Sequence, residues 1–320
     1  MSARDWDVEL YTPTRRADVI SLMRAVEGPP VSEEDFAWEF ERNPVGDLNV
    51  FLAVHAGEVV GISCHNTFRM RLGAEEAVVS FPLKVLTRED FRRRGVFSAL
   101  ERANEEHAER IGAPFMLSFP NAASTPIFLD RLGWTRLEAP RLLVRPLIPG
   151  LAGRTRLPKG LRLLDAQRFG AWADAAWSRS PTERGFVRDA TYLNWRFAEH
   201  PSGRYRLRTV QRDDETVGYA VTGETVKRGR AVNFLAASAV APGLEFAAPA
   251  LRAATIAGTR AKATLDLEPL GVTKADLWRH GYVRVPKRLN LIGKVLDPGY
   301  AGDWLARHRW TFQLGDLDFF

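Results

Sequence analysis

Hydrophobic residues in the first 146 positions follow two spacings, one typical of strands and one of helices. Val19, Ile20, Met23 and Val26 recur at intervals of three and four residues, which predicts an amphipathic helix. Short runs rich in Val, Ile and Phe, bounded by turn residues, predict strands. These patterns predict strands at 8–12, 49–68 (a hairpin turning at 56–57), 75–87, 114–119 and 134–144, and helices at 17–27, 32–40, 97–110 and 124–132.

The second half of the chain repeats this order of elements more faintly. The predicted strands are 161–165, 205–212, 216–228, 231–240, 263–269 and 283–295, and the predicted helices are 166–180, 189–201, 244–258 and 272–281. Two similar units at a period near 150 residues indicate a duplicated α/β domain and not a solenoid array.

Proline and glycine mark the boundary between the two units. Residues 146–160 contain three prolines and three glycines without apolar periodicity, which is typical of a linker. We therefore expect a first domain at 1–146, a linker at 147–160, a second domain at 161–300 and a C-terminal tail at 301–320. The tail ends in aromatic residues, so we expect it to dock near the active site.

Composition narrows the class of protein. The chain has 320 residues and one cysteine, Cys64, which excludes an intrachain disulfide framework and a Cys-based zinc site, and no metal is expected. No run approaches the ~18 apolar residues of a membrane helix, and the start MSARDWDVEL is too polar for a signal peptide. We expect a cytoplasmic protein that binds no membrane.

The net charge of +6 is unevenly distributed. Residues 1–150 carry a net charge of −4 and residues 151–320 one of +10, and 38 of the 45 basic residues are arginine. This arginine bias is typical of a GC-rich coding genome, so nucleic acid is not an expected partner. The basic second half could steer anionic substrates, although a solvated arginine-rich surface is the simpler interpretation.

The sharpest candidate for chemistry is the segment Arg92-Arg93-Arg94-Gly95-Val96-Phe97, which leads directly from a strand and a short loop into a helix. Gly95 permits a tight turn, the N–H groups of the first helical turn point outward, and arginines neutralise phosphate oxygens. The segment therefore favours a phosphate site, with an arginine-rich turn before a surface helix as the alternative.

The element order, this loop and the later segment SFPNAASTPIFLDRLGW resemble the GNAT acyltransferase superfamily over residues 5–146. The resemblance implies tandem GNAT-like α/β domains, each with a mixed, mostly antiparallel sheet flanked by helices. It also implies an acyl-CoA co-substrate, most simply acetyl-CoA. The residues that would contact it are Val85, Leu86 and Thr87 on the strand, Arg92, Arg93, Arg94, Gly95, Val96, Phe97 and Ser98 on the pyrophosphate loop, and Asn121 and Ser124 beside the cofactor.

One position departs from the family pattern. The family commonly has Gly or Ala where this chain has Phe97, so we expect the Phe97 ring to turn outward and leave its backbone amide available. The corresponding loop of the second half has Gly243 but no arginine, and Glu245 would repel phosphate. We therefore expect one coenzyme site per chain and a degenerate second domain that shapes the acceptor pocket.

The groups that move protons are harder to assign. Many family members carry a Glu on the fourth strand and a Tyr on the fourth helix, and this chain has neither at those places. Asp316 and Asp318 in the tail are our candidates for the base or for an anchor of the acceptor ammonium, against a solvated terminus as the alternative. For His65 a hydrogen-bonded core position is favoured over a place in the acceptor pocket.

The predicted function is acyl-CoA-dependent N-acyl transfer, most simply acetyl transfer, to a small amine-bearing acceptor in a ternary complex. One alternative is an aminoacyl-tRNA-dependent transferase, which would use the basic second half. A second alternative is a non-catalytic module that binds acyl-CoA or another ligand.

Overall fold

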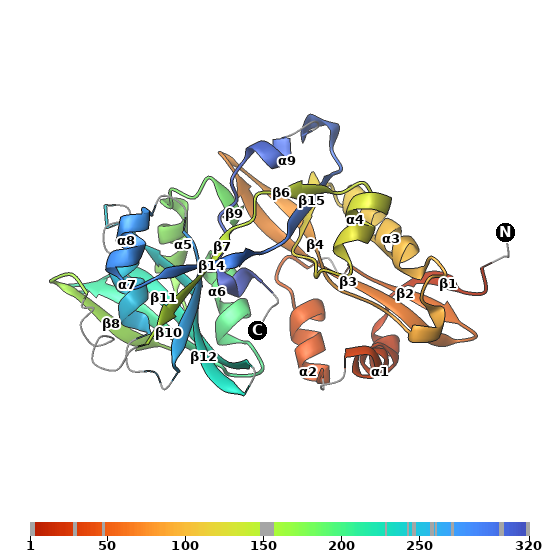
Figure 1. Ribbon diagram of the computed structural model, residues 1–320, viewed down its shortest axis with the longest axis horizontal. Helices are drawn as coiled ribbons and strands as arrows, with labels where there is room; N and C mark the ends of the chain where they lie inside the picture. The colour runs from red at the N-terminus through yellow and green to blue at the C-terminus, as the bar shows by residue number, and fades with distance from the viewer. Residues whose placement is uncertain are drawn as a thin grey trace. The chain divides into compact units, whose positions relative to one another are not determined.

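The computed structural model describes residues 4–27, 31–46, 49–147, 157–227, 229–241, 243–244, 248–256, 259, 261–269, 272–300 and 304–317. Most of the expected linker, together with Glu245 and Asp318, lies outside these residues. The chain forms two units (Figure 1). The first unit contains Met1–Glu138 and Asn290–Arg309, and the second contains Ala139–Leu289 and Trp310–Phe320.

The first unit is built on a mixed sheet with the strand order β1-β2-β3-β4-β5-β15-β6. Neighbouring pairs are antiparallel except β4 and β5, which run parallel. The strands are β1 (Asp7–Leu10), β2 (Asn49–His55), β3 (Glu58–Leu72), β4 (Glu75–Thr87), β5 (Phe115–Ser118), β6 (Thr135–Leu137) and β15 (Leu291–Val295). The helices are α1 (Arg16–Glu27), α2 (Glu33–Phe36), α3 (Val96–Arg110), α4 (Thr125–Arg131) and α9 (Trp304–Arg307), with short turns at Pro13–Arg15, Ala37–Glu41, Glu89–Phe91 and Pro298–Tyr300.

The sheet of the second unit has the order β8-β10-β11-β12-β13-β7-β14, and its parallel pair is β12 with β13. The strands of this sheet are β7 (Arg141–Pro146), β8 (Leu161–Ala166), β10 (Tyr205–Arg212), β11 (Glu215–Lys227), β12 (Arg230–Val240), β13 (Ala263–Leu267) and β14 (Val283–Arg288). The unit also contains the short strand β9 (Arg184–Phe186), which is not part of this sheet and is not predicted from the sequence. The helices are α5 (Ala171–Ser178), α6 (Ala190–Leu193), α7 (Ala248–Thr255) and α8 (Lys274–Arg279), with further turns at Asn194–Ala198 and Leu314–Asp316.

Along the strand orders given above the two sheets correspond strand by strand, but each order contains a strand from the other half of the sequence. β7 was expected to complete the first domain, and it pairs with β13 and β14 in the second sheet. The expected single strand at 283–295 divides into β14, in the second sheet, and β15, which pairs with β5 and β6 in the first. Local apolar patterns predict that a segment is a strand and do not specify its sheet, which explains the difference from the boundaries expected at 146 and 300.

Helices cover both faces of the first sheet. The side chains of α1 and α2 pack with Ile62, Cys64 and other residues on one face. The side chains of α3 pack with Phe51, Ala53 and Val60 on the other. A Cβ atom added at Gly61 of β3 would lie 2.6 Å from Cγ1 of Val96, so this glycine lets the start of α3 approach the sheet closely.

Each unit contains a copy of the same short helical segment. Ser32 begins α2 and Asp189 begins α6, and each side chain accepts a hydrogen bond from the backbone N–H three residues on. In both cases the helix continues into a wider turn of π type, at Ala37–Glu41 and Asn194–Ala198. The pattern W-x-F-x-x-x-P occurs in both segments, starting at Trp38 and Trp195. This repeat supports an internal duplication more directly than element order does.

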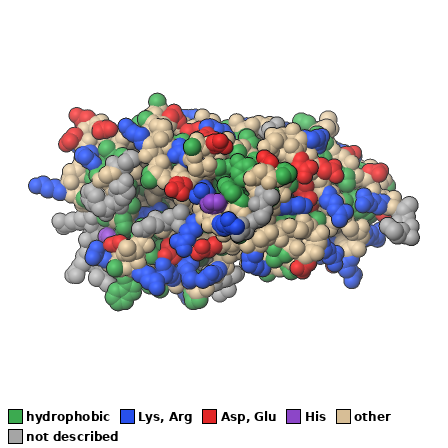
Figure 2. All heavy atoms as spheres, turned by 90° about the horizontal axis from the view of Figure 1, so that it is seen from above, with side chains coloured by type: hydrophobic (Ala, Val, Ile, Leu, Met, Phe, Trp, Pro, Cys, Tyr) green, Lys and Arg blue, Asp and Glu red, His purple; other side chains and the backbone are tan. Residues whose placement is uncertain are grey.

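Charged side chains of both signs are interspersed on the face of the molecule drawn in Figure 2. The positive net charge therefore forms no single-sign patch on that face. Among the described residues, no helix is both long and apolar enough to cross a bilayer.

Candidate active site

The strand β4 has an edge that its neighbour leaves open. β3 pairs with β4 along its whole length, as far as Gly61 with Thr87. β5 pairs with β4 at one register position, Ser80 with Met116. Beyond that point one hydrogen bond is described across the gap. The Ser118 hydroxyl donates to the Pro82 carbonyl, at 3.3 Å. The strands therefore diverge after Ser80, as the resemblance implies.

The register decides which backbone groups of β4 face this open edge. A bulge at Leu83 shifts the pairing, because Pro82 lies opposite His65 and Lys84 lies opposite Cys64. The N–H of Arg88 donates to the carbonyl of Val60, at 2.9 Å. Since bonded and non-bonded pairs alternate along an antiparallel ladder, the backbone groups of Val85 and Thr87 point away from β3, toward the open edge.

The loop after β4 presents backbone N–H groups at the start of α3. Gly95 precedes the helix with φ +84°, and no side chain caps the first turn. A Cβ atom added at Gly95 would meet nothing within 4 Å, so the space beside this backbone is open. The N–H groups of Val96, Phe97 and Ser98 belong to the first helical turn, where no helix carbonyl lies four residues earlier to accept from them. The helix dipole also makes this end favourable for an anion.

The three predicted arginines are all exposed, but they do not lie in equivalent environments. The Arg92 guanidinium lies 3.4 Å from the Thr87 carbonyl oxygen, at the end of the open edge. Arg93 has φ +64°, a conformation that non-glycine residues rarely adopt. Arg94 forms an ion pair with Asp5, at 3.4 Å, and its guanidinium lies over the Phe91 ring.

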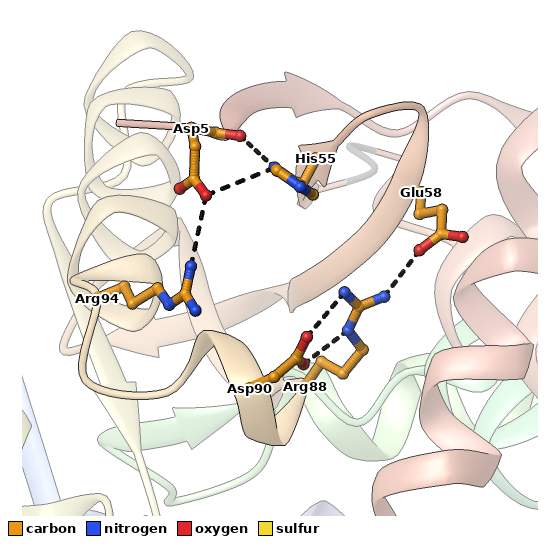
Figure 3. A network of polar contacts seen from close by, with 6 residues as sticks. All are labelled: Asp5, His55, Glu58, Arg88, Asp90 and Arg94. Carbon is orange, nitrogen blue, oxygen red and sulfur yellow. Dashed lines mark hydrogen bonds and ion pairs between the residues drawn. The ribbon is translucent and has the colours of Figure 1, made fainter. Parts of the chain in front are cut away.

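Figure 3 shows that Arg94 is part of a surface network. The Asp5 carboxylate also lies 3.8 Å from Nδ1 of His55. Arg88, whose guanidinium also lies over the Phe91 ring, pairs with Glu58 and Asp90. Hydrogen bonds from this guanidinium lower the pKa of the Asp90 carboxyl. The network fixes the loop around Phe91, and it leaves Arg92 and Arg93 as the arginines most available to an anion.

The remaining predicted cofactor residues have structural partners. The Phe97 ring contacts Phe128 of α4 edge to face, with 5.4 Å between centroids. It therefore turns toward the α3–α4 packing and not toward solvent as expected. The Oδ1 atom of Asn121 accepts hydrogen bonds from the N–H groups of Ala123 and Ser124, both at 2.9 Å. Asn121 and Ser124 thus form the turn that begins α4.

A buried polar cluster lies beneath the point where β4 and β5 diverge. Nδ1 of His65 is 3.1 Å from the Ser80 hydroxyl, and Nε2 of His65 is 3.3 Å from Oε1 of Glu101. The Ser63 hydroxyl donates to the same Glu101 oxygen at 2.6 Å, and Asn104 donates to Ser63 at 2.8 Å. All five side chains are fully buried, so His65 occupies the favoured core position.

Ser63, Ser80, Glu101 and Asn104 are not among the site residues predicted from the sequence. A signal was present on α3, where Glu101 and Asn104 fall at helical spacing between Phe97 and Ala108, on the stripe that faces the sheet. Two polar residues in such a stripe indicate a buried network, because an unpaired polar group inside a core is costly. Cys64 lies on the opposite face of β3, and burial raises the pKa of its thiol.

The tail candidate Asp316 is buried in the second unit. Its carboxylate accepts hydrogen bonds from Arg188 at 2.5 Å, from the Tyr192 hydroxyl at 2.8 Å and from the Gln313 N–H at 2.7 Å. Burial and the Asp316 carboxylate raise the pKa of Tyr192 well above its usual value, so its hydroxyl keeps its proton. Asp316 lies in the short 3-10 turn Leu314–Asp316.

These contacts define a class of domain: a mixed α/β sheet with two diverging parallel strands and an uncapped, glycine-led helix beside the gap. Residues 7–137 match the family model described as an acetyltransferase (GNAT) domain. This match covers most of the first segment of the first unit and indicates a GNAT acetyltransferase fold there. No curated protein is similar enough to the chain to count as a relative.

Solved structures extend the likeness of fold to most of the chain. A GCN5-related N-acetyltransferase from Anabaena variabilis matches with a TM-score of 0.69 and 10% identity, over 91% of this chain and 72% of its own. A probable N-acyltransferase from Enterococcus faecalis matches with a TM-score of 0.68 and 10% identity, over 91% and 73%. Eis1 from Mycobacterium abscessus matches with a TM-score of 0.60 and 13% identity, over 91% and 73%.

Proposed function

We propose that the first unit binds an acyl-CoA, most simply acetyl-CoA, and transfers its acyl group to a small amine-bearing acceptor. The observation that carries this proposal is the open edge of β4 next to the uncapped start of α3. The outward backbone groups of Val85 and Thr87 suit the amides of a pantetheine arm. The N–H groups that follow Gly95, together with Arg92 and Arg93, suit the pyrophosphate.

The reaction we propose is direct transfer in a ternary complex. The neutral amine attacks the thioester carbonyl carbon, a C–N bond forms and the C–S bond breaks. The departing thiolate takes up a proton, and the new ammonium group loses one. In this proposal, backbone N–H groups at the bulge near Leu83 donate to the carbonyl oxygen, which gains negative charge as the amine attacks.

The general base of this reaction is still a prediction, and its two candidates, Asp316 and Asp318, lie in the C-terminal tail. The three donors to Asp316 favour a role as anchor of the tail over one as base, because Arg188, Tyr192 and Gln313 already occupy its carboxylate oxygens. Asp318 lies outside the described residues and stays a candidate from sequence.

A matched pair of glycine substitutions tests the cofactor assignment. Gly95 and Gly73 both have positive φ (+84° and +76°), and an added Cβ would meet nothing at either site. Gly95→Ala and Gly73→Ala should therefore each cost about 1–2 kcal/mol of stability from backbone strain. Only Gly95→Ala should weaken acetyl-CoA binding in calorimetric titration, because Gly73 lies in the β3–β4 hairpin turn.

A thermal-shift measurement tests whether any coenzyme binds at all. Acetyl-CoA at 100 times its dissociation constant should stabilise the protein by about 2.7 kcal/mol. No shift with any CoA ester would refute the proposal. If binding occurs, thiol release measured over a panel of amines separates a transferase from a binding module.

A further inference from the structure

The strand β12 of the second unit corresponds to β4 of the first, residue by residue. β4 has its bulge at Leu83, and β12 has one at Ala236, because Leu235 lies opposite Thr222 and Ala237 lies opposite Val221. Four residues after each bulge the strand ends opposite a glycine of its neighbour, Gly61 in β3 and Gly218 in β11. Ser238, two residues after the bulge, therefore occupies the place that Val85 has in the first unit.

The parallel neighbour of β12, which is β13, also stops pairing with it before the strand ends. β12 pairs with β13 at Asn233 and Phe234, just before the bulge. The N–H of Ala241 donates to the carbonyl of Val217, at 2.7 Å. By the alternation of the ladder, the backbone groups of Ser238 point away from β11, toward the edge that β13 leaves. The second unit thus keeps the same strand edge as the first.

The C-terminal segment occupies this edge. The Gln313 carboxamide forms two hydrogen bonds with the Ser238 backbone: its Oε1 accepts from the N–H and its Nε2 donates to the carbonyl, both at 2.9 Å. An amide group has one donor side and one acceptor side, and here both face one residue of a strand. This pairing is the one that a secondary amide of a ligand lying along the edge would make with a strand backbone.

Further contacts fix the segment in place. The Arg196 guanidinium donates to the carbonyl of Gly315 at 2.6 Å and to that of Leu317 at 3.3 Å. A Cβ atom added at Gly315 would lie 2.6 Å from the Phe197 ring and 2.9 Å from the Ala236 carbonyl oxygen, which is the bulge of β12. The chain therefore passes in direct contact with the bulge and leaves no space there for a second ligand.

We propose that residues 310–317 are the resident ligand of the second unit, with the Gln313 carboxamide in the place of a pantetheine amide. The second unit then has the strand edge of an acyl-CoA site and is closed to acyl-CoA by its own chain. This inference rests on the proposed function of the first unit, and it predicts one acyl-CoA bound per chain.

Hydrogen exchange followed by mass spectrometry on the full chain tests the proposal, read in two fragments, 82–88 and 235–241. Acetyl-CoA should slow exchange in 82–88 and leave 235–241 unchanged. Gln313→Leu should speed exchange in 235–241 by roughly tenfold, because the Ser238 N–H loses its acceptor. Gln313→Glu should do the same, since one carboxylate oxygen would face the Ser238 carbonyl. Gln167→Leu, at an exposed glutamine before α5, is the matched control and should change neither fragment.

Three results would overturn the proposal: slower exchange in 235–241 on addition of acetyl-CoA, two acetyl-CoA molecules bound per chain in calorimetric titration, or unchanged exchange in 235–241 of both Gln313 variants. Failure of the proposed function gives a different result, in which acetyl-CoA slows neither fragment. The Gln313 variants are read without acetyl-CoA and therefore test the occupied edge separately.

Discussion

Nε2 of His65 lies 3.3 Å from Oε1 of Glu101, and both side chains are completely buried. Their contact joins β3 to α3, the helix whose first turn forms the candidate anion site. The position of that turn relative to β4 thus depends on a polar contact inside the core as well as on apolar packing.

Replacing Glu101 with Leu should destabilise the first unit by about 2–4 kcal/mol, because the Ser63 hydroxyl and the His65 ring would both lose a buried partner. Glu101→Gln keeps an acceptor oxygen and should cost less. Glu106→Gln, on the exposed side of α3, is the control and should be nearly neutral. Urea denaturation measures all three; equal costs for Glu101→Leu and Glu106→Gln would contradict the network.

The close approach of α3 to the sheet makes a second prediction. Gly61→Ala should cost about 1–3 kcal/mol, because its Cβ would overlap Cγ1 of Val96 at 2.6 Å. Adding Val96→Ala should recover part of this loss by removing the methyl group that clashes. Gly170→Ala, whose added Cβ would have no contact shorter than 3.6 Å, is the control. Thermal unfolding of the two single variants and the double variant gives the coupling between residues 61 and 96, and additive effects would refute the clash.

A substitution at Arg93 should change folding stability and acetyl-CoA affinity in opposite directions. Arg93→Gly removes a side chain from a strained positive-φ position, and it should stabilise the free protein by about 1 kcal/mol while weakening acetyl-CoA binding. Asp213→Gly relieves a similar strain, at φ +53°, in a turn of the second unit and should stabilise without changing binding. Differential scanning fluorimetry and calorimetric titration check the two effects. Equal affinity in both variants would remove Arg93 from the site.

His280 makes the second unit sensitive to acid. Burial, together with the nearby charges of Arg145 and Arg279, lowers the pKa of His280 below its usual 6.5, and Asp276 opposes the shift. The unfolded chain therefore binds this proton more tightly, so the stabilising contribution is complete above pH 6.5 and is lost as the pH falls through the folded-state pKa. His280→Asn should flatten the fall in melting temperature below pH 6.5. An unchanged slope would show that other groups control it.

Most elements and the candidate anion loop could be predicted from the sequence alone. Apolar spacing predicted α1, α3 and most strands of both sheets, because side-chain periodicity is a local property of the backbone. It missed the three-residue strand β9 and joined β14 and β15 into one strand. Gly95 directly before a helix indicated a tight turn, since only glycine adopts positive φ without strain. The resemblance to GNAT proteins likewise followed from the order of helices and strands and from the Arg92–Phe97 motif. The family match over residues 7–137 agrees with it.

Tertiary structure decided which sheet each strand joins and what each polar side chain contacts. β7 and β15 each belong to the sheet of the other half of the chain, although their own patterns are ordinary. Asp316 and Gln313 became anchors of the tail through contacts with residues 75 to 128 positions away. Hydrophobic periodicity fixes which face of an element is buried, while hydrogen bonds between distant segments depend on how the whole chain packs. For that reason the sequence predicted a candidate anion loop, whereas the contacts of the tail required the tertiary structure.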